Sequence, residues 1–523
     1  MPSWGILQDP KHPYVPGTIK LNEDVSAEKL ADWEYQEPKK RGDTILNPQP
    51  SDSPNDPLNW PTSTKLAILV ILSFASGVTV SLGPMLTPGM EDIAKKFNVT
   101  TDQASFNLVG LLLAATGGAL CFTAAAAAVW GKRPVFFLST LCLFATSTWG
   151  FFSPNLLSLT ASRFIQGVAA APLDTLIGAT VSELFFVHEK GRMLSIWNMF
   201  VMGGPKLGPL VSGFIIQNLG FEFTFGICAL LYFVIAVLMY FLLLETVFVE
   251  KEPVTEVIFD KSSLRIYEII IPEKKKSYSE RLKIFQGRVS KNASFWRLSF
   301  KPFPLILFPV VIYAAITFST YAASITLVAL LQDTIFSEAP YNLTVSQIGL
   351  TNVPLFAIGL VGTLLSGYAA DGIVQFMTRK NNGVCEPEFR LVLMLIAATL
   401  STTAYLGVGY SVSAGAHISI PIVFLGLHTA AVPFANSAMF TYVMDCHSQH
   451  APQAFVTMGL AKGLMALGLS NFVNGWYDKS GPKAVFTIVA IVSLAVSLMS
   501  LPMYIFGKRL RSKIARSSFH QGI

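Results

Sequence analysis

Few ionisable residues stand inside the long apolar stretches of this chain, and they are its main candidates for chemistry. They are Arg163, Asp174, Lys206, His428 and Lys462. Because a charge in hydrocarbon is costly, residues kept there pair with one another, face water or mark the path of an ion or a substrate. Carboxylates and imidazoles exchange protons, whereas lysine and arginine hold anionic groups. We therefore treat the five as functional candidates, with purely structural partners as the alternative.

Lys206 and Asp174 fall at similar depths in two consecutive apolar stretches. The helical rise places them about 8 Å apart in depth, which a lysine side chain can span. An ion pair between them would offset the cost of burial. In the alternative, Lys206 points into a cavity and meets an anionic substrate. Lys462 is a second lysine of this kind, in the eleventh predicted helix. Two lysines against one aspartate favour a neutral or anionic organic substrate over a polycation, unless both lysines only satisfy local partners.

Four uncharged polar residues complete the predicted lining of a substrate cavity. In hydrocarbon such groups need hydrogen-bond partners, so we expect most to join helices and a minority to touch the substrate. His428 is a further cavity candidate because an unperturbed imidazole titrates near neutral pH, although a lone histidine is more often structural. The four residues are Gln166, Tyr321, Asn352 and Asn436.

The composition identifies the elements that must position these residues. Of 523 residues, 52% are hydrophobic and only 13% are charged, and the mean hydropathy is +0.51. A soluble protein has about 25% charged residues and could not bury so much apolar surface. The chain is therefore predicted to be an all-α, multi-pass membrane protein. The same numbers exclude disordered, collagen-like and disulfide-rich secreted proteins.

Twelve apolar runs are long enough to cross a bilayer as helices. They form two groups of six with short connections inside each group. We predict a polar tail at 1–65, a six-helix bundle at 66–244, a central loop at 245–302, a second bundle at 303–506 and a basic tail at 507–523. The runs are 66–90, 105–128, 134–152, 157–182, 193–217, 223–244, 303–331, 346–370, 391–411, 418–443, 453–475 and 483–506.

The placement of lysine and arginine predicts how the spans are oriented. If both termini lie in the cytoplasm, most of the 38 basic residues face the cytoplasm, as the positive-inside rule requires. The N-terminal tail lacks the apolar segment of a signal peptide, so we expect the first span to direct insertion. The basic residues from Lys508 to Arg516 are expected to be a positive-inside signal, with contact to anionic lipid as the alternative.

Three Asn-x-Ser/Thr sequons provide a test of this orientation. Asn98 and Asn342 would lie outside the cell and are predicted to be glycosylated. Asn292 would lie in the central cytoplasmic loop, where we expect it to remain unmodified.

The fifth predicted helix contains a run of small residues from Gly204 to Gly213. Gly204, Gly208 and Gly213 would let a neighbouring helix approach closely, and Pro209 would kink the helix. The run resembles the G-x-x-x-G-P-x-x-G-G signature of antiporters in the major facilitator superfamily, with Ser212 in place of one glycine. Its place on the fifth of twelve helices matches that family. The alternative is a close helix pair without a role in transport.

The fourth predicted helix carries a second motif of the same family. Its segment from Leu159 to Ala171 resembles L-x-x-x-R-x-x-Q-G-x-G-A-A, with Ala169 in place of a glycine. The resemblance implies that Arg163 belongs to the proton-coupling machinery, and Asp174 stands where family members often have an acid. We therefore assign proton coupling to Arg163 and Asp174. The alternative for Arg163 is a side chain that extends to the outer surface.

Two segments resemble parts of the superfamily's loop G-x-L-x-D-R-x-G-R-R-x-V. Gly131, Lys132 and Arg133 match its second half after the second helix, and Gly367 and Asp371 match its first half after the eighth. In the family this loop makes contacts between the two halves that hold one conformational state. Its recurrence at corresponding places supports an internal repeat.

Further segments narrow the resemblance to fungal members of the twelve-span drug:proton antiporter branch. It covers about residues 47–507 and implies two pseudo-symmetric six-helix bundles with the major facilitator fold. It also implies a monomer in the plasma membrane, with the vacuolar membrane as the alternative. The segments are 47–61, 186–192, 382–391 and 433–445.

The sequence holds no P-loop, no His-Glu-x-x-His and no Gly-x-Ser-x-Gly motif. We therefore expect no catalysis, no cofactor, no metal and no nucleic-acid partner, and we expect the energy to come from a proton gradient. The leading hypothesis is proton-coupled efflux of a small organic compound, such as a toxin, a drug or a secondary metabolite. The alternatives are proton symport of a nutrient and a transporter-like sensor that moves little solute.

Overall fold

The structure is a computed structural model of the whole chain. It describes residues 4–7, 15, 17–20, 39–41, 44–45, 48–248, 255–260, 265–270, 277–285, 287–289, 294–447 and 450–516. Of 19–20, 40–41, 44–45, 187–188, 255–260, 265–270, 279 and 515 it describes the backbone alone. The predicted unmodified sequon at Asn292 lies outside the described residues.

The first six predicted spans are helices that form one bundle. Short connections join most consecutive helices, and Gly131 and Gly220 at two of these connections have φ of 93° and 99°, which suits glycine. Within this bundle α2 packs on α8, α5 on α7 and α6 on α9. The helices are α2 (Thr62–Ser81), α4 (Thr101–Ser105) with the π-helical turn η3 (Phe106–Gly110) and α5 (Leu111–Trp130), α6 (Lys132–Phe151), α7 (Leu156–Leu184), α8 (Val187–Leu219) and α9 (Phe221–Leu242).

The last six spans form the second bundle. Here α14 packs on α16, α15 on α16 and α18, and α12 on α16 and α17. The helices are α12 (Pro309–Ser337), α13 (Val345–Leu350) with α14 (Asn352–Lys380), the 3-10 helix η5 (Pro387–Val392) with α15 (Leu393–Ser413), α16 (Ser419–Cys446), α17 (Ala451–Ser470), and α18 (Val473–Leu498) with α19 (Ser500–Ala515).

Shorter elements lie at the two ends of the bundles. Each pair of strands is antiparallel, and β1 pairs with β6 although the two are far apart in sequence. The short helices are η1 (Pro57–Asn59), η2 (Pro84–Gly89), α3 (Met90–Phe97), α10 (Tyr278–Arg281), α11 (Phe295–Phe300) and η4 (Phe303–Leu307). The strands are β1 (Ile19–Lys20), β2 (Lys40–Arg41), β3 (Thr44–Ile45), β4 (Thr255–Asp260), β5 (Arg265–Ile270) and β6 (Val384–Cys385).

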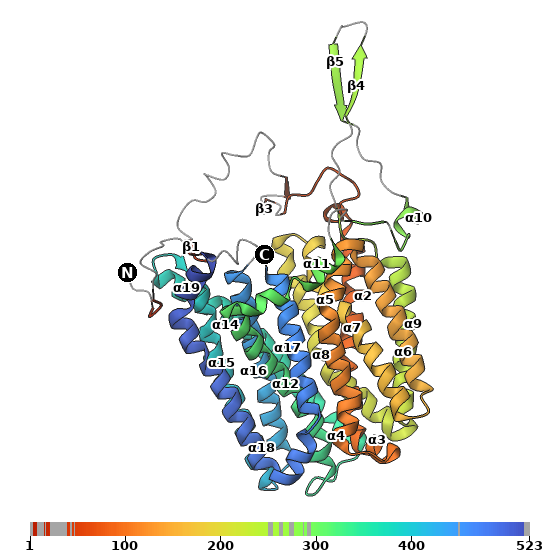
Figure 1. Cartoon of the computed structure of the whole chain (residues 1–523), viewed down its shortest axis with the longest axis vertical. Coiled ribbons are helices and arrows are strands. Elements are labelled where there is room, and N and C mark those ends of the chain that lie inside the picture. The colour runs from red at the N-terminus through yellow and green to blue at the C-terminus, as the bar shows by residue number, and fades with distance from the viewer. Residues whose placement is uncertain are drawn as a thin grey trace.

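The described segment 4–7 and the end of α19 lie on the same face of the bundles (Figure 1). We call it the terminal face, and we call the other end, where α3 and α4 lie, the opposite face. The long helices run between the two faces. The bundles meet along two seams, where α5 packs against α17 and α8 packs against α13 and α14.

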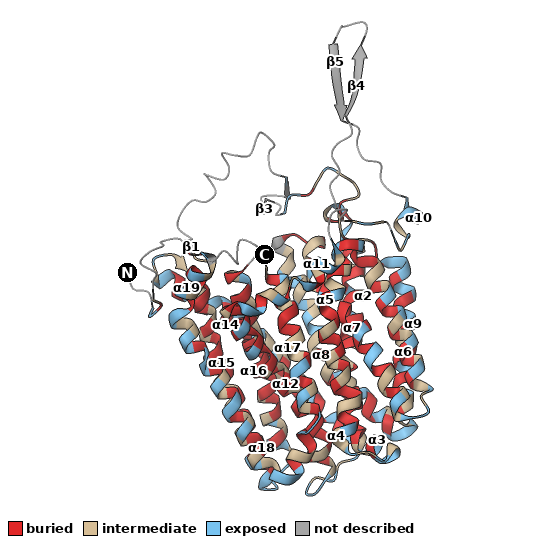
Figure 2. Cartoon of the chain, viewed as in Figure 1, coloured by how far each residue is buried: buried red, intermediate tan, exposed pale blue. Residues whose placement is uncertain are grey.

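The distribution of buried residues fits a protein surrounded by lipid. Figure 2 shows buried residues on the inner sides of the helices and exposed ones on their outer sides. Many exposed side chains on these helices are large and apolar, such as Leu138, Leu230 and Ile491. A soluble protein rarely exposes so much contiguous apolar surface. This pattern agrees with the predicted all-α membrane protein.

Within the described residues, eleven helices are long and apolar enough to cross a membrane. The twelfth predicted span, 453–475, corresponds to α17, which has the length but a lower hydropathy because it includes Gln453 and Lys462. The two six-helix bundles of the prediction are therefore confirmed, with α17 as the most polar member.

Several predicted boundaries are wrong, and prolines explain two of them. The first span ends at Ser81 instead of 90, because Pro84 and Pro88 allow only the 3-10 helix η2. The seventh begins at Pro309, not 303, where proline suits the first helical turn.

The eighth span is longer than predicted, and this corrects the loop assigned to Gly367 and Asp371. Both residues lie inside α14, which continues to Lys380. No proline interrupts this segment, and the helix ends only where Asn382 and Gly383 adopt positive φ. Asp371 is exposed, and it forms no ion pair with the residues that the structure describes.

The predicted internal repeat is visible at the starts of the second and eighth spans. Thr100 and Gln103 form a capping box at the start of α4, and Thr344 and Gln347 form the same box at the start of α13. In each box the threonine oxygen and the glutamine side chain satisfy free backbone N–H groups. The two bundles therefore begin their second helices in the same way.

Candidate functional site

An ion pair joins the two bundles inside the membrane-spanning region. Lys462 on α17 donates from Nζ to Oδ2 of Asp174 on α7 over 3.2 Å. The side chains remain 29% and 18% exposed, so the pair is partly accessible. The prediction that Asp174 pairs with Lys206 is therefore wrong. Depth along two helices does not determine which way the side chains face, and the actual partner is 288 residues away in sequence.

Lys206 lies on the side of α8 that faces the second bundle. Residues 203, 206, 210 and 213 share one helical face. A methyl group added at Gly203 would lie 3.4 Å from Phe356, and one added at Gly213 would lie 3.3 Å from Gly349. Lys206 itself is only 6% exposed. It makes no hydrogen bond or ion pair with the described residues, so its ammonium group is buried at the seam without a counter-ion.

Arg163 is fully buried inside the first bundle, so it does not extend to the outer surface. Its guanidinium group donates to Leu82 O over 2.6 Å, to Leu108 O over 2.8 Å and to Gln166 Oε1 over 2.9 Å. Leu82 follows the last residue of α2, and Leu108 lies in the π-helical turn η3. Helix ends and π-turns leave carbonyls free to accept such bonds. The ring of Phe225 covers the guanidinium at 5.5 Å.

Gln166 belongs to the same network instead of facing a cavity. Its amide oxygen accepts from Arg163, and its Nε2 donates to Ser147 Oγ on α6 over 2.9 Å. Together the two residues link α2, η3, α6 and α7. This is the helix-joining role that we expected for most of the polar residues.

Tyr321 and His428 lie in hydrogen-bonded positions inside the second bundle. Tyr321 OH is 2.9 Å from Ser497 Oγ and 3.3 Å from Ser401 Oγ. His428 Nε2 is 3.1 Å from Ser324 Oγ and 3.3 Å from Tyr405 OH. These contacts join α12, α15, α16 and α18.

The two remaining cavity candidates, Asn352 and Asn436, differ in whether their side chains have hydrogen-bond partners. Asn352 is buried and donates from Nδ2 to Gly349 O over 3.3 Å, within its own helical turn. Asn436 is half-buried, and its Oδ1 is buried without a partner in the part of the chain that the structure describes. Of the uncharged candidates, Asn436 therefore keeps an unused acceptor.

The glycines of the fifth-helix motif make close contacts with two different helices. Gly204 packs against the backbone of Gly77 on α2, with no room for a methyl group. A methyl group at Gly208 would lie 2.6 Å from Ser81 Cβ, and one at Gly213 would lie 2.9 Å from Val345 O. Pro209 lies inside α8. The motif therefore joins α8 to its own bundle through two glycines and to the second bundle through the third.

On the terminal face of the first bundle, Gly131 forms the turn between α5 and α6, and Lys132 and Arg133 begin α6. Lys132 Nζ lies 2.7 Å from Glu183 Oε1. The backbone N–H groups of Lys132 and Arg133 donate to the Glu245 carboxylate over 3.0 and 3.1 Å. Burial raises the pKa of Glu245, although these N–H bonds oppose the rise. The Arg133 guanidinium donates to the backbone oxygens of Tyr240, Arg281 and Lys283.

The second bundle has a corresponding contact on the same face. Arg390 at the start of its third span donates from Nε to Asp445 Oδ2 at the end of its fourth over 3.0 Å. Lys132 and Glu183 occupy the same places in the first bundle. The repeat therefore extends to the ion pairs on the terminal face.

A buried ion cluster joins the last helix, α19, to the segment before α15. Glu388 accepts from Arg511 over 2.8 and 3.0 Å, and Glu386 accepts from Lys508 and lies 3.4 Å from Arg511. All four residues are buried. Lys508 and Arg511 were expected to be a simple positive-inside signal or to touch lipid. The structure places both in ion pairs with the carboxylates before α15, away from lipid, and their role as a positive-inside signal stays a prediction.

The N-terminal segment docks on this cluster. Thr18 Oγ1 donates to Glu386 Oε2 over 2.7 Å, and the backbone of Ile19 pairs with that of Cys385. Ile6 packs against Met377 and Phe389. The sequence of the N-terminal tail carried no signal for this contact.

The opposite face holds both predicted glycosylation sites. Asn98 follows α3 and Asn342 precedes α13, and both are exposed. Both have left-handed backbones with φ of 52° and 49°, a conformation that asparagine tolerates.

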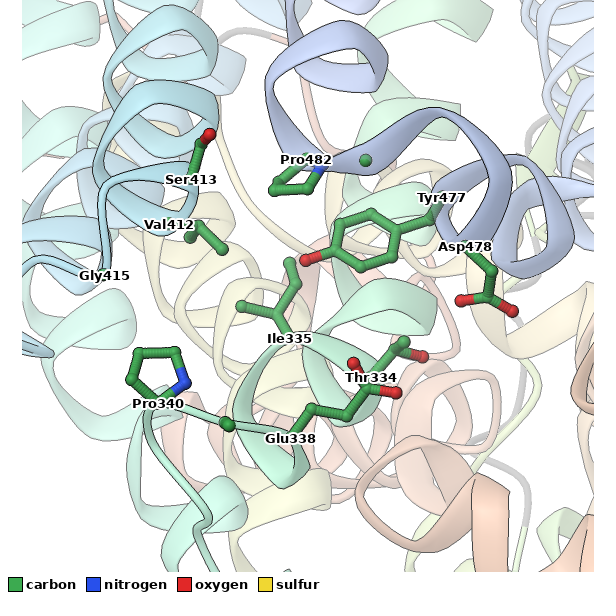
Figure 3. Close-up of a pocket in the computed structure, with 12 residues that line it drawn as sticks. Thr334, Ile335, Glu338, Pro340, Val412, Ser413, Gly415, Tyr477, Asp478 and Pro482 are labelled. Carbon is green, nitrogen blue, oxygen red and sulfur yellow. The ribbon is translucent and has the colours of Figure 1, made fainter.

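A cavity of about 520 Å³ also opens on the opposite face. Figure 3 shows Glu338, Tyr477 and Asp478 along its wall, with Pro340 and Pro482 nearby. The lining residues come from α12, α15, α18 and the turns after α12 and α15, all within the second bundle. None of the predicted site residues lines it, so it is not the predicted substrate cavity.

The architecture agrees with a comparison against known families. Residues 67–470 match the family model described as Major Facilitator Superfamily. The chain belongs to the major facilitator superfamily. The predicted fold, two pseudo-symmetric six-helix bundles of the major facilitator type, is thereby confirmed.

Individual relatives of this superfamily are fungal, as the motifs implied. An uncharacterised transporter from Schizosaccharomyces pombe is 24% identical over 97% of this chain and 94% of its own length. Protein HOL1 from Saccharomyces cerevisiae is 22% identical over 96% of each chain. Efflux pump radE from Floropilus chiversii is 20% identical over 91% of this chain and 86% of its own length.

A solved structure of the superfamily shows the same fold. The crystal structure of a D-xylose-proton symporter matches with a TM-score of 0.61, over 85% of this chain and 99% of that chain. Its sequence is 13% identical, so the match concerns the fold alone. In a transporter of this fold, residues at the seam between the bundles are placed to respond when the bundles move. Asp174, Lys462 and Lys206 occupy that place here.

Proposed function

We propose that this transporter exports a small organic compound and is driven by protons. The observation that carries the proposal is the ion pair between Asp174 and Lys462, one residue from each bundle. A carboxylate at the moving seam is able to take a proton when its lysine partner withdraws. The relatives include a protein named as an efflux pump, which supports the direction of transport.

The physical basis of coupling is the cost of an unpaired charge in a low dielectric. When the seam opens, Asp174 loses Lys462, and a proton then replaces the lysine as the neutralising charge. When the seam closes, Lys462 returns and favours release of the proton. Binding of the proton and separation of the bundles are thus linked through one pair. Arg163 contributes by holding the helices that position α7.

The proposed substrate is neutral or anionic. Lys206 places a buried positive charge on the side of α8 that faces the second bundle, and it has no acidic partner among the described residues. A cationic substrate would be repelled there, whereas a carboxylate or an uncharged acceptor would offset the burial of the ammonium group.

The proposed location is the plasma membrane, with the protein as a monomer and the terminal face in the cytoplasm. The positive-inside distribution of lysine and arginine supports this orientation. The vacuolar membrane is the alternative location, and the same orientation would apply there.

The experiment uses purified protein in proteoliposomes loaded with a pH-sensitive dye. A panel of weak organic acids and neutral lipophilic compounds is added, and proton flux is recorded with wild type, Asp174→Asn and Lys462→Arg. We expect wild type to move protons opposite to a transported compound. Asp174→Asn should exchange labelled compound for unlabelled compound but move no protons, whereas Lys462→Arg should keep coupling because the charge is retained.

Two outcomes would change the proposal. Proton flux at the wild-type rate in Asp174→Asn would remove Asp174 from coupling. Protons that move in the same direction as the compound would replace antiport by symport.

A further inference from the structure

On the opposite face, Asp102 and Asp333 each accept hydrogen bonds from the first turn of a helix. In both cases the helix belongs to the bundle that does not contain the carboxylate. Asp102 on α4 accepts from the backbone N–H of Asn474 and of Gly475, each over 2.8 Å. These N–H groups lie in the first turn of α18, where a helix has free donors. Asp102 of the first bundle therefore acts as the N-terminal cap of a helix in the second.

The reciprocal contact comes from Asp333 near the end of α12. Its Oδ2 accepts from the backbone N–H of Glu91 over 2.9 Å, in the first turn of α3. Asp333 is buried. Thus each bundle supplies one carboxylate, and that carboxylate caps a helix of the opposite bundle.

Neither carboxylate forms an ion pair within the part of the chain that the structure describes. No lysine, arginine or histidine there lies within ion-pair distance of Asp102 or Asp333. The Glu91 side chain is paired with Lys95 over 2.7 Å and accepts from Ser337 over 3.4 Å. The partially positive ends of α18 and α3 are therefore the main electrostatic partners of the two carboxylates.

Neutral contacts surround the two caps at the same level. Asn474 Nδ2 donates to Ser105 Oγ over 3.3 Å, and Ser346 N donates to Gln217 Oε1 over 2.9 Å. These bonds also cross between the bundles, along both seams. The caps are thus the charged part of a layer of polar contacts that closes the opposite face.

We propose that Asp102 and Asp333 are the gate residues of the opposite face, and that breaking their two helix caps opens that face during transport. When the bundles separate there, the first turns of α18 and α3 lose their acceptors together. The caps therefore set the equilibrium between the closed and open states of this face. The inference goes beyond the proposed function, because it requires only that the two faces open alternately and not that protons drive the cycle.

The experiment measures opening of the face through a buried cysteine. Ser105 is fully buried beside Asn474, so Ser105→Cys reacts with a maleimide only when the face opens. Labelling rates are measured in nanodiscs, without substrate, for Ser105→Cys alone and combined with Asp102→Ala, Asp102→Asn or Asp333→Ala. Asp92→Ala is the matched control, because Asp92 is exposed on α3 and forms no hydrogen bond or ion pair with the second bundle among the described residues.

We expect each alanine variant to raise the labelling rate by roughly 3- to 30-fold, the range that loss of a helix cap gives. Asp102→Asn keeps one acceptor oxygen, so its rate should lie between wild type and alanine. Because both caps act on one opening, the double alanine variant should show the product of the two factors.

Labelling rates equal to the Asp92→Ala control in both single alanine variants would overturn the proposal. Thermal unfolding of each variant is recorded alongside. If Asp102→Ala or Asp333→Ala does not fold, Asp102→Asn decides: a wild-type rate in that variant also overturns the proposal. Since no substrate or pH gradient is used, a failure here leaves the proposed function intact, and the reverse is also true.

Discussion

Two buried cations of this transporter have opposite surroundings. Arg163 donates to two backbone carbonyls and a glutamine, whereas Lys206 has no hydrogen-bond partner among the described residues. A satisfied buried charge stabilises its surroundings, and an unsatisfied one costs free energy until something else meets it. We therefore expect replacement of Arg163 to destabilise the protein and replacement of Lys206 to stabilise it.

Replacing Arg163 should destabilise the first bundle. Arg163→Ala leaves Leu82 O, Leu108 O and Gln166 Oε1 without their donor, and each buried neutral acceptor left unsatisfied costs about 1–3 kcal/mol. Thermal unfolding in detergent measures the effect, with the exposed Arg192→Ala on α8 as the control. A melting temperature equal to that of the control would mean that water or relaxation satisfies the three acceptors.

Replacing Lys206 should stabilise the protein and impair its binding of anions. A lysine at the centre of the membrane costs about 2.5–3.5 kcal/mol on insertion scales, so Lys206→Met should raise the folded yield. If the ammonium group meets the substrate, affinity for anionic compounds should fall about tenfold or more, which corresponds to one charge-assisted hydrogen bond. Binding titrations compare Lys206→Met with Lys190→Met on the same helix. Unchanged affinity for every anionic compound would leave Lys206 without a role in binding.

The sequence singled out three charged residues that lie at the seam, but it did not predict how they pair. Asp174, Lys206 and Lys462 all stood out as charges in apolar runs. The pairing was wrong because sequence fixes depth along a helix and not the direction of the side chain across a bundle. Asp333 was not counted as a membrane acid because it follows the predicted span 303–331. Asp102 gave only the signal of a polar residue near a helix start.

At the scale of elements, α8 depends on glycine where it meets α2. The backbone of Gly77 leaves no space for a methyl group at Gly204. Gly204→Ala should therefore separate the two helices at a cost of about 1–3 kcal/mol. Gly118→Ala on α5 is the control, since nothing lies within 4 Å of a methyl group there.

Thermal unfolding and transport rates of both glycine variants provide the measurement. Gly118→Ala should be neutral or stabilising by up to about 1 kcal/mol, because alanine favours the helix. Equal stability of the two variants would contradict the close contact between α8 and α2.

The elements were easier to predict than their ends. Twelve apolar runs gave the number and order of the helices, because hydropathy over about 20 residues is a strong signal. The positions of the helix ends depended on individual residues, such as prolines and capping residues, which the hydropathy of an apolar run does not report. Pro84 ended the first helix early, and a polar but uninterrupted segment carried α14 past Gly367 and Asp371 to Lys380. Gly367 and Asp371 match the sequence of the family's loop motif, but their backbone is helical.

At the scale of the whole molecule, the two sequons test the orientation. Asn98 and Asn342 lie on the opposite face, so both should carry glycans if the terminal face is cytoplasmic. Because both have positive φ, aspartate is the appropriate replacement. Glycosidase treatment should lower the apparent mass of the wild-type protein on a gel. The decrease should be smaller for Asn98→Asp and for Asn342→Asp, and the double variant should show none. Loss of the shift in Asn292→Gln instead would reverse the orientation.

The docking of the N-terminal segment has a consequence for how the protein is made. Tyr504 OH donates to Trp4 O over 3.0 Å, a contact between residues 500 positions apart. At about 5–20 residues per second, a ribosome completes one roughly 25–100 s after the other. Ile6 is therefore synthesised well before Met377 and Phe389, the residues against which it packs. Docking of the first residues on the last helix is thus a late step of biosynthesis, and it marks a chain whose second bundle is complete.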